Sequence, residues 1–330
     1  MANLPKIRRV GPRASHPVET TAGGPADIQR IEAHGLTWLN IESPTERETA
    51  WLAENYDFHP LDLEDVQSRR RQRAKIDDYA DYTFIVLHFP RFDKRTGRLQ
   101  AAELNVFIAR DLVITLPNEP LKPLSAMWAR CSTREDERDA LMGKGPGFLL
   151  YEIVDATFDY CFPILDKIGF KLDQLEDAIF DGRSEESVRD ISNVKQEIIN
   201  YRKIIKPQRP TLRLLERNIE QYAPQDLEIY FDDIVDKNER IWDLLENAKE
   251  VVEALEATNE SVITHRLNDM VKLLTMLSAV ILPLTLVTGF YGMNVPYPGF
   301  ARHWGFVTSM VLMVGLVIIL WAQFKRHDWI

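Results

Sequence analysis

Two uncharged apolar runs near the C-terminus constrain this chain more than any other feature. No Asp, Glu, Lys or Arg occurs from residue 273 to 301 or from residue 304 to 324. The hydrocarbon core of a bilayer is about 30 Å thick, and a helix of roughly 20 residues spans it. The sequence therefore predicts a membrane protein with two spans, and the polar turn between them is a place where a short pore mouth could form.

Composition and motifs narrow the class of function. The formal net charge of −10 disfavours a nucleic-acid partner and suits cations better. No Gly-rich phosphate loop of the Walker type is present, which counts against an ATPase and a nucleotide partner. The histidines are scattered without zinc-ligand spacing, and no nucleophile–base arrangement is evident. We expect no enzyme and no organic cofactor, and we expect Cys131 and Cys161 to be free thiols.

Basic residues around the apolar runs predict the topology. Lys272 lies at the start of the first run, and Lys325 and Arg326 follow the second, whereas the loop between them holds one arginine and one histidine. By the positive-inside rule, both termini are expected in the cytoplasm and residues 292–303 outside it. No signal peptide precedes these runs, so the expected location is the plasma (inner) membrane, crossed twice.

The first part of the chain is predicted to be a cytosolic α/β domain at residues 25–146, after a disordered tail at 1–24. Runs of β-branched and aromatic residues indicate strands, and turn or capping residues indicate helix starts. The expected strands are Thr37–Ile41, Tyr82–Phe89 and a pair within Glu103–Leu116; one helix is capped by Ser43, and another starts at His59-Pro60.

A cytosolic helical hairpin is predicted at residues 147–226. Apolar residues recur at steps of three and four over Phe148–Leu175 and again over Ser187–Asn218, which is typical of two amphipathic helices. Pro207 and Pro210 are expected to interrupt the second helix.

A very long helix is predicted at residues 227–291, where Pro283 is the only proline and Gly289 the only glycine. At about 1.5 Å per residue it would be roughly 100 Å long. Its heptad spacing predicts a coiled coil that runs into the first span, at about 271–291. The seam residues are Ile234, Ile241, Leu244, Ala248, Val251, Leu255, Thr258 and Val262. The second span is expected at 304–324, before a basic C-terminus at 325–330.

One face of the first span alternates apolar with small polar side chains. Its residues fall at steps of three or four: Asn268, Val271, Leu274, Ser278, Leu282, Thr285 and Gly289. Two spans cannot enclose a pore, so conduction would require a homo-oligomer with this stripe at its axis. Ordinary packing of membrane helices explains the same stripe and remains an alternative.

The end of the first span offers oxygen acceptors. Mg2+ is small and dehydrates reluctantly, so it usually keeps several waters. A hydrated ion presents hydrogens outward, and the Asn294 side chain and the Gly292 carbonyl could accept them. Further along the helix, rings of Leu274 and Leu282 could close a pore by dewetting.

At these residues the chain resembles the CorA family of magnesium channels. The signature is Tyr291-Gly292-Met293-Asn294 after Pro283-Leu284-Thr285, directly before a second span. The likeness covers about residues 36–330. Its upstream parts are His59-Pro60-Leu61, Leu63-Glu64-Asp65, Ile85-Val86-Leu87, and Leu150-Tyr151 with Asp155.

This resemblance implies a funnel-shaped homopentamer in membrane lipid, with a selectivity filter of Gly292, Met293 and Asn294 and with the stripe above lining the pore. It also implies regulatory Mg2+ sites between neighbouring cytosolic domains. Their ligands would be Asp65 with Asp233 and, adjacent to them, Glu64 with Asp155. A divalent ion would bridge carboxylates that otherwise repel, so high internal Mg2+ would close the channel. From the residues alone, such carboxylates more commonly cap or solvate a helix.

Departures from the family pattern leave other functions open. The loop at residues 295–300 has no carboxylate, and the C-terminal basic cluster is thin, which is similar to the zinc-transporting branch. The leading hypothesis is gated, passive transport of Mg2+, with Co2+ and Ni2+. The second is proton-coupled zinc transport on the same scaffold. The third, from another class, is a non-conducting membrane-anchored coiled-coil sensor or scaffold.

Overall fold

The computed structural model describes residues 26–68, 72–93, 95–222, 227–293, 296, 299 and 302–327. The chain divides into two compact units. One comprises Met1–Asp177 with Arg189–Leu255, and the other comprises Ala178–Val188 with Glu256–Ile330. Asn294 and the last three residues lie outside the described part, as does the predicted tail at 1–24.

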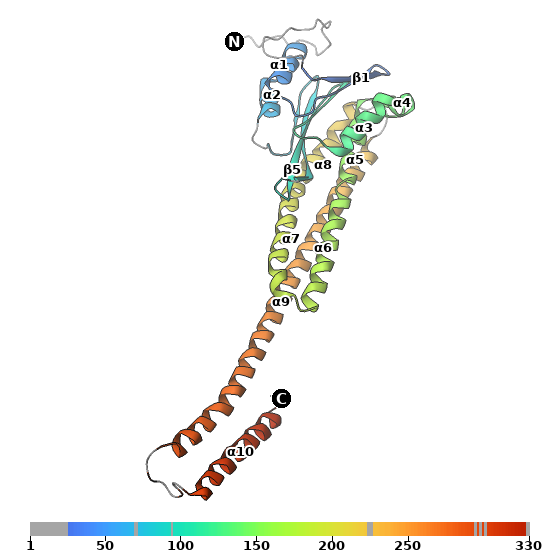
Figure 1. Ribbon diagram of the computed structural model, residues 1–330. Coiled ribbons are helices and arrows are strands. Elements are labelled where there is room, and N and C mark those ends of the chain that lie inside the picture. Colours follow the sequence, from blue (N-terminus) through green and yellow to red (C-terminus); the bar gives the residue numbers. More distant parts are fainter. Residues whose placement is uncertain are drawn as a thin grey trace, which may run out of the picture. The chain divides into compact units, whose positions relative to one another are not determined.

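A six-stranded mixed sheet forms the centre of the first unit (Figure 1). Its order is β1-β2-β6-β5-β4-β3, and only the β2–β6 pair is parallel. The strands are β1 (Gln29–Ala33), β2 (Leu36–Asn40), β3 (Lys75–Asp78), β4 (Thr83–Asp93), β5 (Arg98–Ile108) and β6 (Leu112–Pro117). The β1–β2 hairpin turns on His34 and Gly35, which both have positive φ, as a two-residue hairpin loop requires.

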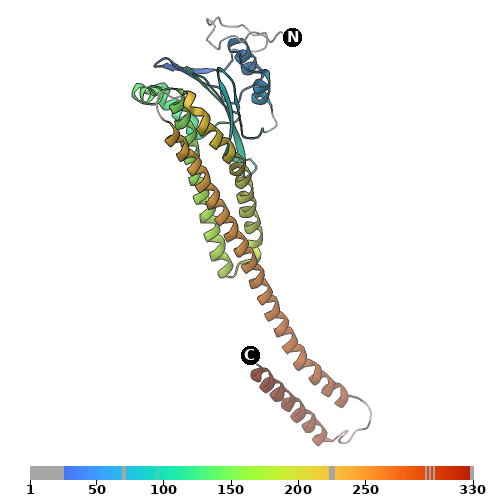
Figure 2. The same ribbon diagram turned by 180° about the vertical axis from the view of Figure 1, so that it is seen from behind.

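Helices cover both faces of the sheet, which explains why the central strands are apolar at successive positions. On one face, α1 (Glu46–Asn55) and α2 (Pro60–Gln67) pack against the sheet, and the Phe58 ring after α1 stacks 4.2 Å from Phe107. On the other face lie α3 (Lys122–Thr133), α4 (Glu135–Met142) and α5 (Pro146–Asp159) (Figures 1 and 2). There Trp128 of α3 contacts Trp38, and Phe158 of α5 contacts Phe89.

The start of α1 differs from the prediction. Thr45, not Ser43, is the N-cap: the Glu48 side chain accepts the Thr45 backbone N–H at 2.9 Å, which completes a capping box. Ser43 instead has a φ of 54°, in the left-handed region, two residues before the cap. The start of α2 is as predicted, because His59 Nδ1 accepts the Leu61 N–H and Pro60 occupies the first turn.

The helical hairpin contains more breaks than its apolar pattern predicts. The predicted helix Phe148–Leu175 is wrong as a single element, since α5 ends at Asp159 and α6 (Phe162–Phe180) begins after Cys161. Pro163 explains this break, because it has no N–H to donate to the Asp159 carbonyl. The predicted interruption at Pro207 and Pro210 is confirmed. It separates α7 (Ser184–Ile205) from η1 (Lys206–Gln208) and α8 (Arg209–Asn218), and η2 (Ile219–Tyr222) follows α8.

The long helix α9 (Glu228–Tyr291) is confirmed, and its first part lies beside α6 and α7 (Figures 1 and 2). Lys171 of α6 pairs with Glu197 of α7 at 2.7 Å, and Arg209 Nε bonds Glu239 of α9 at 2.9 Å. The buried seam of α9 is Ile234, Ile241, Leu245, Val252 and Leu255. Leu244 and Val251, predicted in the seam, are exposed by 41% and 39% in the single chain. The adjacent residues Leu245 and Val252 are buried in their place, because their side of α9 faces α6 and α7.

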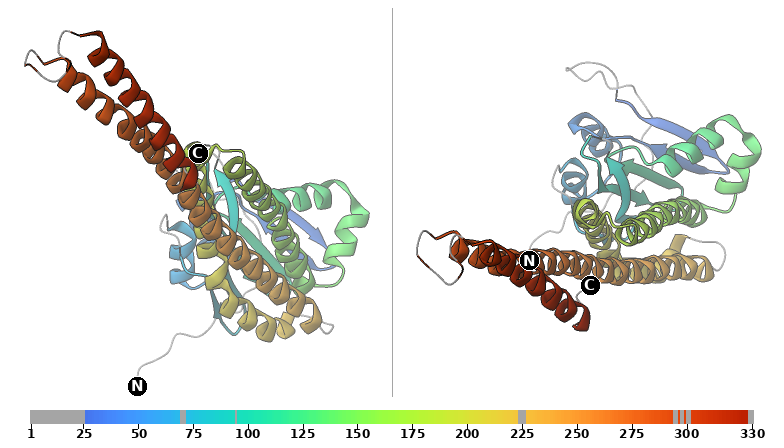
Figure 3. Two further views of the ribbon diagram at one scale, coloured as in Figure 1. Left: turned by 90° about the horizontal axis from the view of Figure 1, so that it is seen from below. Right: turned by 60° about the horizontal axis from the view of Figure 1, so that its bottom comes forward.

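The second unit contains the two candidate membrane spans. The chain turns back after α9 into α10 (His303–Arg326) (Figure 3). The most apolar 18-residue windows of α9 and α10 have mean hydropathies of 2.1 and 2.4, and only 6% and 11% of each window is buried. Buried core helices of soluble proteins do not leave such faces uncovered, so the observed exposure suits membrane spans.

Candidate metal sites and pore-lining helix

The predicted pore stripe is exposed along its whole length in the single chain. Its residues are Asn268, Val271, Leu274, Ser278, Leu282, Thr285 and Gly289. The apolar members Leu274 and Leu282 expose 64% and 69% of their surface. Large apolar side chains exposed to this extent need lipid or another protein chain to cover them.

The threonines of this helix bond to their own backbone. Thr285 Oγ1 donates to the Ile281 carbonyl at 2.8 Å, and Thr275 Oγ1 donates to the Val271 carbonyl at the same distance. The hydroxyl proton is therefore taken up within the helix, whereas the oxygen still has lone pairs that can accept a hydrogen bond. Thr285 can thus act as an acceptor toward the hydrogens of a hydrated cation.

Gly292 directly follows α9, at a position where a side chain would be crowded by the backbone. Its N–H donates to the Thr288 carbonyl at 2.9 Å, and an added Cβ would lie 2.9 Å from that same oxygen. Met293 follows with its N–H on the Phe290 carbonyl and is exposed. The third predicted filter residue, Asn294, lies outside the described residues.

A second tight approach precedes α10. The Arg302 N–H donates to the Gly299 carbonyl at 3.1 Å, and a Cβ on Gly305 would lie 2.4 Å from that carbonyl oxygen. Gly299 has a φ of 95° and lies against the Trp304 ring. These two glycines therefore allow the backbone at Gly299 to lie close against the start of α10.

The four candidate regulatory carboxylates fall into two groups. In the first, on α5 and α9, Asp155 and Asp233 share one ammonium. Lys237 Nζ lies 2.5 Å from Asp155 Oδ1, 2.8 Å from Asp159 Oδ1 and 3.6 Å from Asp233 Oδ2. Three carboxylates around one ammonium leave a formal net charge of −2.

Asp155, Asp159 and Asp233 together with Lys237 are called the acidic cluster. Partial burial shifts the pKa values of its groups. Burial raises the pKa of Asp155, although Lys237 opposes the rise. Burial would lower the pKa of Lys237, but its hydrogen bonds to Asp155 and Asp159 outweigh burial and raise it. Burial and the nearby carboxylates also raise the pKa of Tyr151 to about 12. Lys237 therefore remains charged at physiological pH.

The second group lies on α2. Glu64 is exposed, and Asp65 pairs with Lys75 of β3 at 2.7 Å. A buried network fixes α2 to the sheet: Tyr82 Oη donates to Asp62 Oδ2 at 2.8 Å and accepts the His59 N–H at 2.8 Å. Burial raises the pKa of Asp62 and, strongly, that of Tyr82, which keeps the phenol protonated as a donor.

The two groups do not form one site within the described part of a single chain. No set of three or more His, Cys, Asp or Glu side chains there is arranged to hold a metal ion. Asp155 and Asp233 are predicted from the sequence as metal ligands, whereas their neighbours in the cluster, Asp159 and Lys237, are not. The available signal was spacing, since Asp155/Asp159 and Asp233/Lys237 each lie one helical turn apart.

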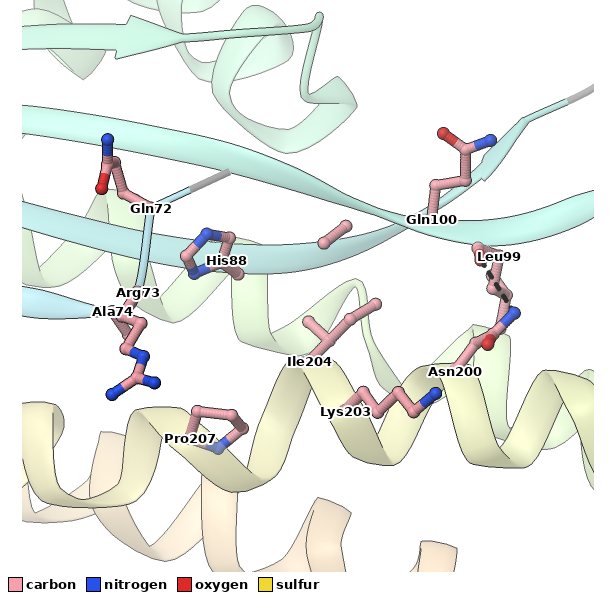
Figure 4. A pocket seen from close by; sticks show the side chains of 11 residues that line it. Gln72, Arg73, Ala74, His88, Leu99, Gln100, Asn200, Lys203, Ile204 and Pro207 are labelled. Atoms are coloured by element: carbon pink, nitrogen blue, oxygen red, sulfur yellow. Dashed lines mark hydrogen bonds between the residues drawn. The ribbon is translucent and has the colours of Figure 1, made fainter. Parts of the chain in front are cut away.

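A pocket of about 380 Å3 lies elsewhere in the first unit, between strands β4 and β5 and helix α7 (Figure 4). Arg73 and Lys203 line it, so its charge does not suit a cation. His88 also lines it, with Nε2 3.5 Å from Glu103 Oε2. Burial would raise the pKa of Glu103, but His88 and hydrogen bonds from Asn105 and the Gln72 N–H lower it.

A mixed α/β unit and a helix that continues into the first of two spans define a two-span membrane protein with a large extramembrane part. The model of the family described as CorA-like Mg2+ transporter protein matches residues 33–326. The chain therefore belongs to this family of divalent-cation transporters, which are not enzymes.

Curated relatives and a solved structure agree with this assignment. The cobalt/magnesium transport protein CorA of Thermotoga maritima is 27% identical over 89% of this chain and 83% of its own length. The putative metal ion transporter YfjQ of Bacillus subtilis is 27% identical over 92% and 93% of the two chains. The structure of the CorA magnesium transporter from Methanocaldococcus jannaschii matches with a TM-score of 0.79 at 23% identity, covering 94% of this chain and 96% of that chain. The predicted CorA-like fold is thus confirmed.

Proposed function

We propose that five copies of this chain form a gated channel that conducts Mg2+, and also Co2+ and Ni2+, passively across the plasma (inner) membrane. Both termini lie in the cytoplasm, and α9 lines the pore. The observation that carries this proposal is the family match, which runs through both spans. The Tyr291-Gly292-Met293-Asn294 sequence stands where α9 ends.

The residues along the exposed stripe support a path for a hydrated ion. The Gly292 carbonyl, the Asn294 amide and the Thr285 hydroxyl offer neutral acceptor oxygens, which bind a water-coated Mg2+ weakly enough to release it. Rings of Leu274 and Leu282 form the apolar constriction that closes by dewetting. Ser278, which lies between the two leucines, and Gly289, which lies beyond Leu282, are small and leave the pore wider at their levels.

Cytosolic Mg2+ closes the channel in this proposal. Asp65 of one subunit faces Asp233 of the next, and Glu64 faces Asp155, so that a divalent ion links neighbouring subunits. The net charge of −2 in the cluster around Lys237 supports this role. Loss of the ion leaves like charges opposed across the interface, and α9 transmits the loosening to the constriction.

Ion flux tests the proposal directly. Purified protein in liposomes should take up Mg2+ under a membrane potential, with slower uptake of Co2+ and Ni2+ and no requirement for a proton gradient. Uptake of Zn2+ that depends on a pH gradient, with little Mg2+ flux, would support the zinc hypothesis instead. The absence of a carboxylate at residues 295–300 is the feature that favours that second function.

Mutation of the inter-subunit carboxylates should weaken regulation. Asp233→Asn and Asp65→Asn each remove a charge that the metal would bind, so the Mg2+ concentration that half-protects the cytosolic region from protease should rise about tenfold. Asp243→Asn, exposed on the same helix but ten residues beyond Asp233, is the matched control and should leave the midpoint unchanged. Unchanged midpoints in both Asp233→Asn and Asp65→Asn would show that these residues are not the ligands.

A further inference from the structure

Lys237 occupies the centre of the acidic cluster. Its ammonium contacts the carboxylates of Asp155, Asp159 and Asp233 at 2.5, 2.8 and 3.6 Å. Two of these carboxylates, Asp155 and Asp233, are the ones that the proposed function assigns to metal. The ammonium therefore takes part of the negative charge that a divalent ion would otherwise meet.

The contacts differ in strength and access. Asp155 is the most buried of the three carboxylates and holds Lys237 most closely, at 2.5 Å. Asp233 makes the longest contact, and its side chain is 55% exposed. Asp233 can therefore turn toward a cation from solvent while the ammonium stays with Asp155 and Asp159.

The same arrangement recurs at the other candidate ligand. Lys75 Nζ lies 2.7 Å from Asp65 Oδ2, and Asp77 also pairs with it. Each predicted half of the inter-subunit site thus has a lysine within the single chain. Lysine suits such a role, since its point charge sits on a flexible four-carbon stem and can move aside.

From these contacts we propose that Lys237 is a built-in competitor for the regulatory metal, and that it sets the cytosolic Mg2+ concentration at which the channel closes. The inference rests on the proposed function, because it assumes that Asp233 and Asp155 bind the regulatory ion. At low Mg2+ the ammonium partly neutralises the cluster and limits the repulsion between its carboxylates. At high Mg2+ the metal takes Asp233, and the ammonium stays on Asp159 and on Oδ1 of Asp155, which leaves the other oxygen of Asp155 for the ion shared with Glu64.

The test compares Mg2+ protection in the full-length purified oligomer. Protease resistance of the cytosolic region is followed as MgCl2 is raised from a chelated start, for the wild type and for Lys237→Met, which keeps length and removes charge. The midpoint for Lys237→Met should fall about tenfold, since the cluster then has no internal cation. Lys237→Arg keeps the charge and should stay within about twofold of the wild type.

Two results distinguish a wrong role for Lys237 from a wrong assignment of Asp233 as a metal ligand. If Asp233→Asn shifts the midpoint but Lys237→Met does not, the lysine is only a structural partner and the inference is overturned. If Asp233→Asn has no effect, the site assignment itself is wrong. Should Lys237→Met fail to assemble, Lys237→Gln in the same assay replaces it, and an unchanged midpoint there also overturns the inference.

Discussion

Asn294→Ala should reduce Mg2+ uptake to the level of empty liposomes while the oligomer still assembles. In the proposed pore, each subunit contributes one amide oxygen to a ring that meets the hydrated ion first. Alanine removes all of these oxygens at once, and a methyl group cannot replace the hydrogen bonds that the ion's water makes. The measurement is Mg2+ uptake by proteoliposomes under a fixed potential, with oligomer size checked by light scattering.

Asn268→Ala provides the matched comparison. Asn268 is the asparagine of the exposed stripe, and it lies before the apolar part of α9. Its loss should slow uptake less than the loss of Asn294, because the ion is not selected there. Full uptake by Asn294→Ala would refute the filter, and a wild-type protein that assembles but takes up no metal would support the scaffold hypothesis.

Tyr82→Phe should destabilise the first unit by roughly 2 kcal/mol, since it removes the hydroxyl that the His59 backbone N–H and the buried Asp62 carboxylate share. The Tyr82 hydroxyl links the His59 N–H to Asp62, and Tyr82 and Asp62 are exposed by only 3% and 1%. These bonds hold the first turn of α2, the helix that presents Glu64 and Asp65. The substitution should therefore also weaken Mg2+ protection.

Tyr79→Phe is the control for this change. Tyr79 donates to the same Asp62 carboxylate, but at 3.2 Å and from a less buried position. It should cost less than about 1 kcal/mol, and amide exchange of α2 should rise only in Tyr82→Phe. Equal effects of the two substitutions on thermal unfolding would mean that the His59 contact contributes nothing.

Features set by local chemistry could be predicted from the sequence. The long helix needs only a continuous apolar repeat without Gly or Pro, and α9 has it from Glu228 almost to its end. The break at Pro207 and the start of α2 at His59-Pro60 follow from missing N–H groups and capping. The two candidate spans follow from the length of uncharged sequence.

Features that depend on partners distant in the sequence could not be predicted. Whether Leu244 or Leu245 enters the seam depends on where α6 and α7 lie against α9, which the heptad spacing alone does not fix. The contact of Lys237, on α9, with Asp155 and Asp159 of α5 requires two helices some 80 residues apart in the chain to meet. The capping of α1 by Thr45 was within reach, because Glu48 stands three residues after it.

Gln208 has a consequence for the solubility of the chain before it reaches a membrane. Strand β3 begins at Lys75, so it stops short of the position opposite His88 on β4. Gln208 fills that place: its side chain accepts the His88 N–H at 2.8 Å and donates to the His88 carbonyl at 2.6 Å. Open strand edges invite strands from other molecules, and a single amide from the helical layer closes this one. In the folded unit, β4 is thereby closed at this point against pairing with a strand of another molecule.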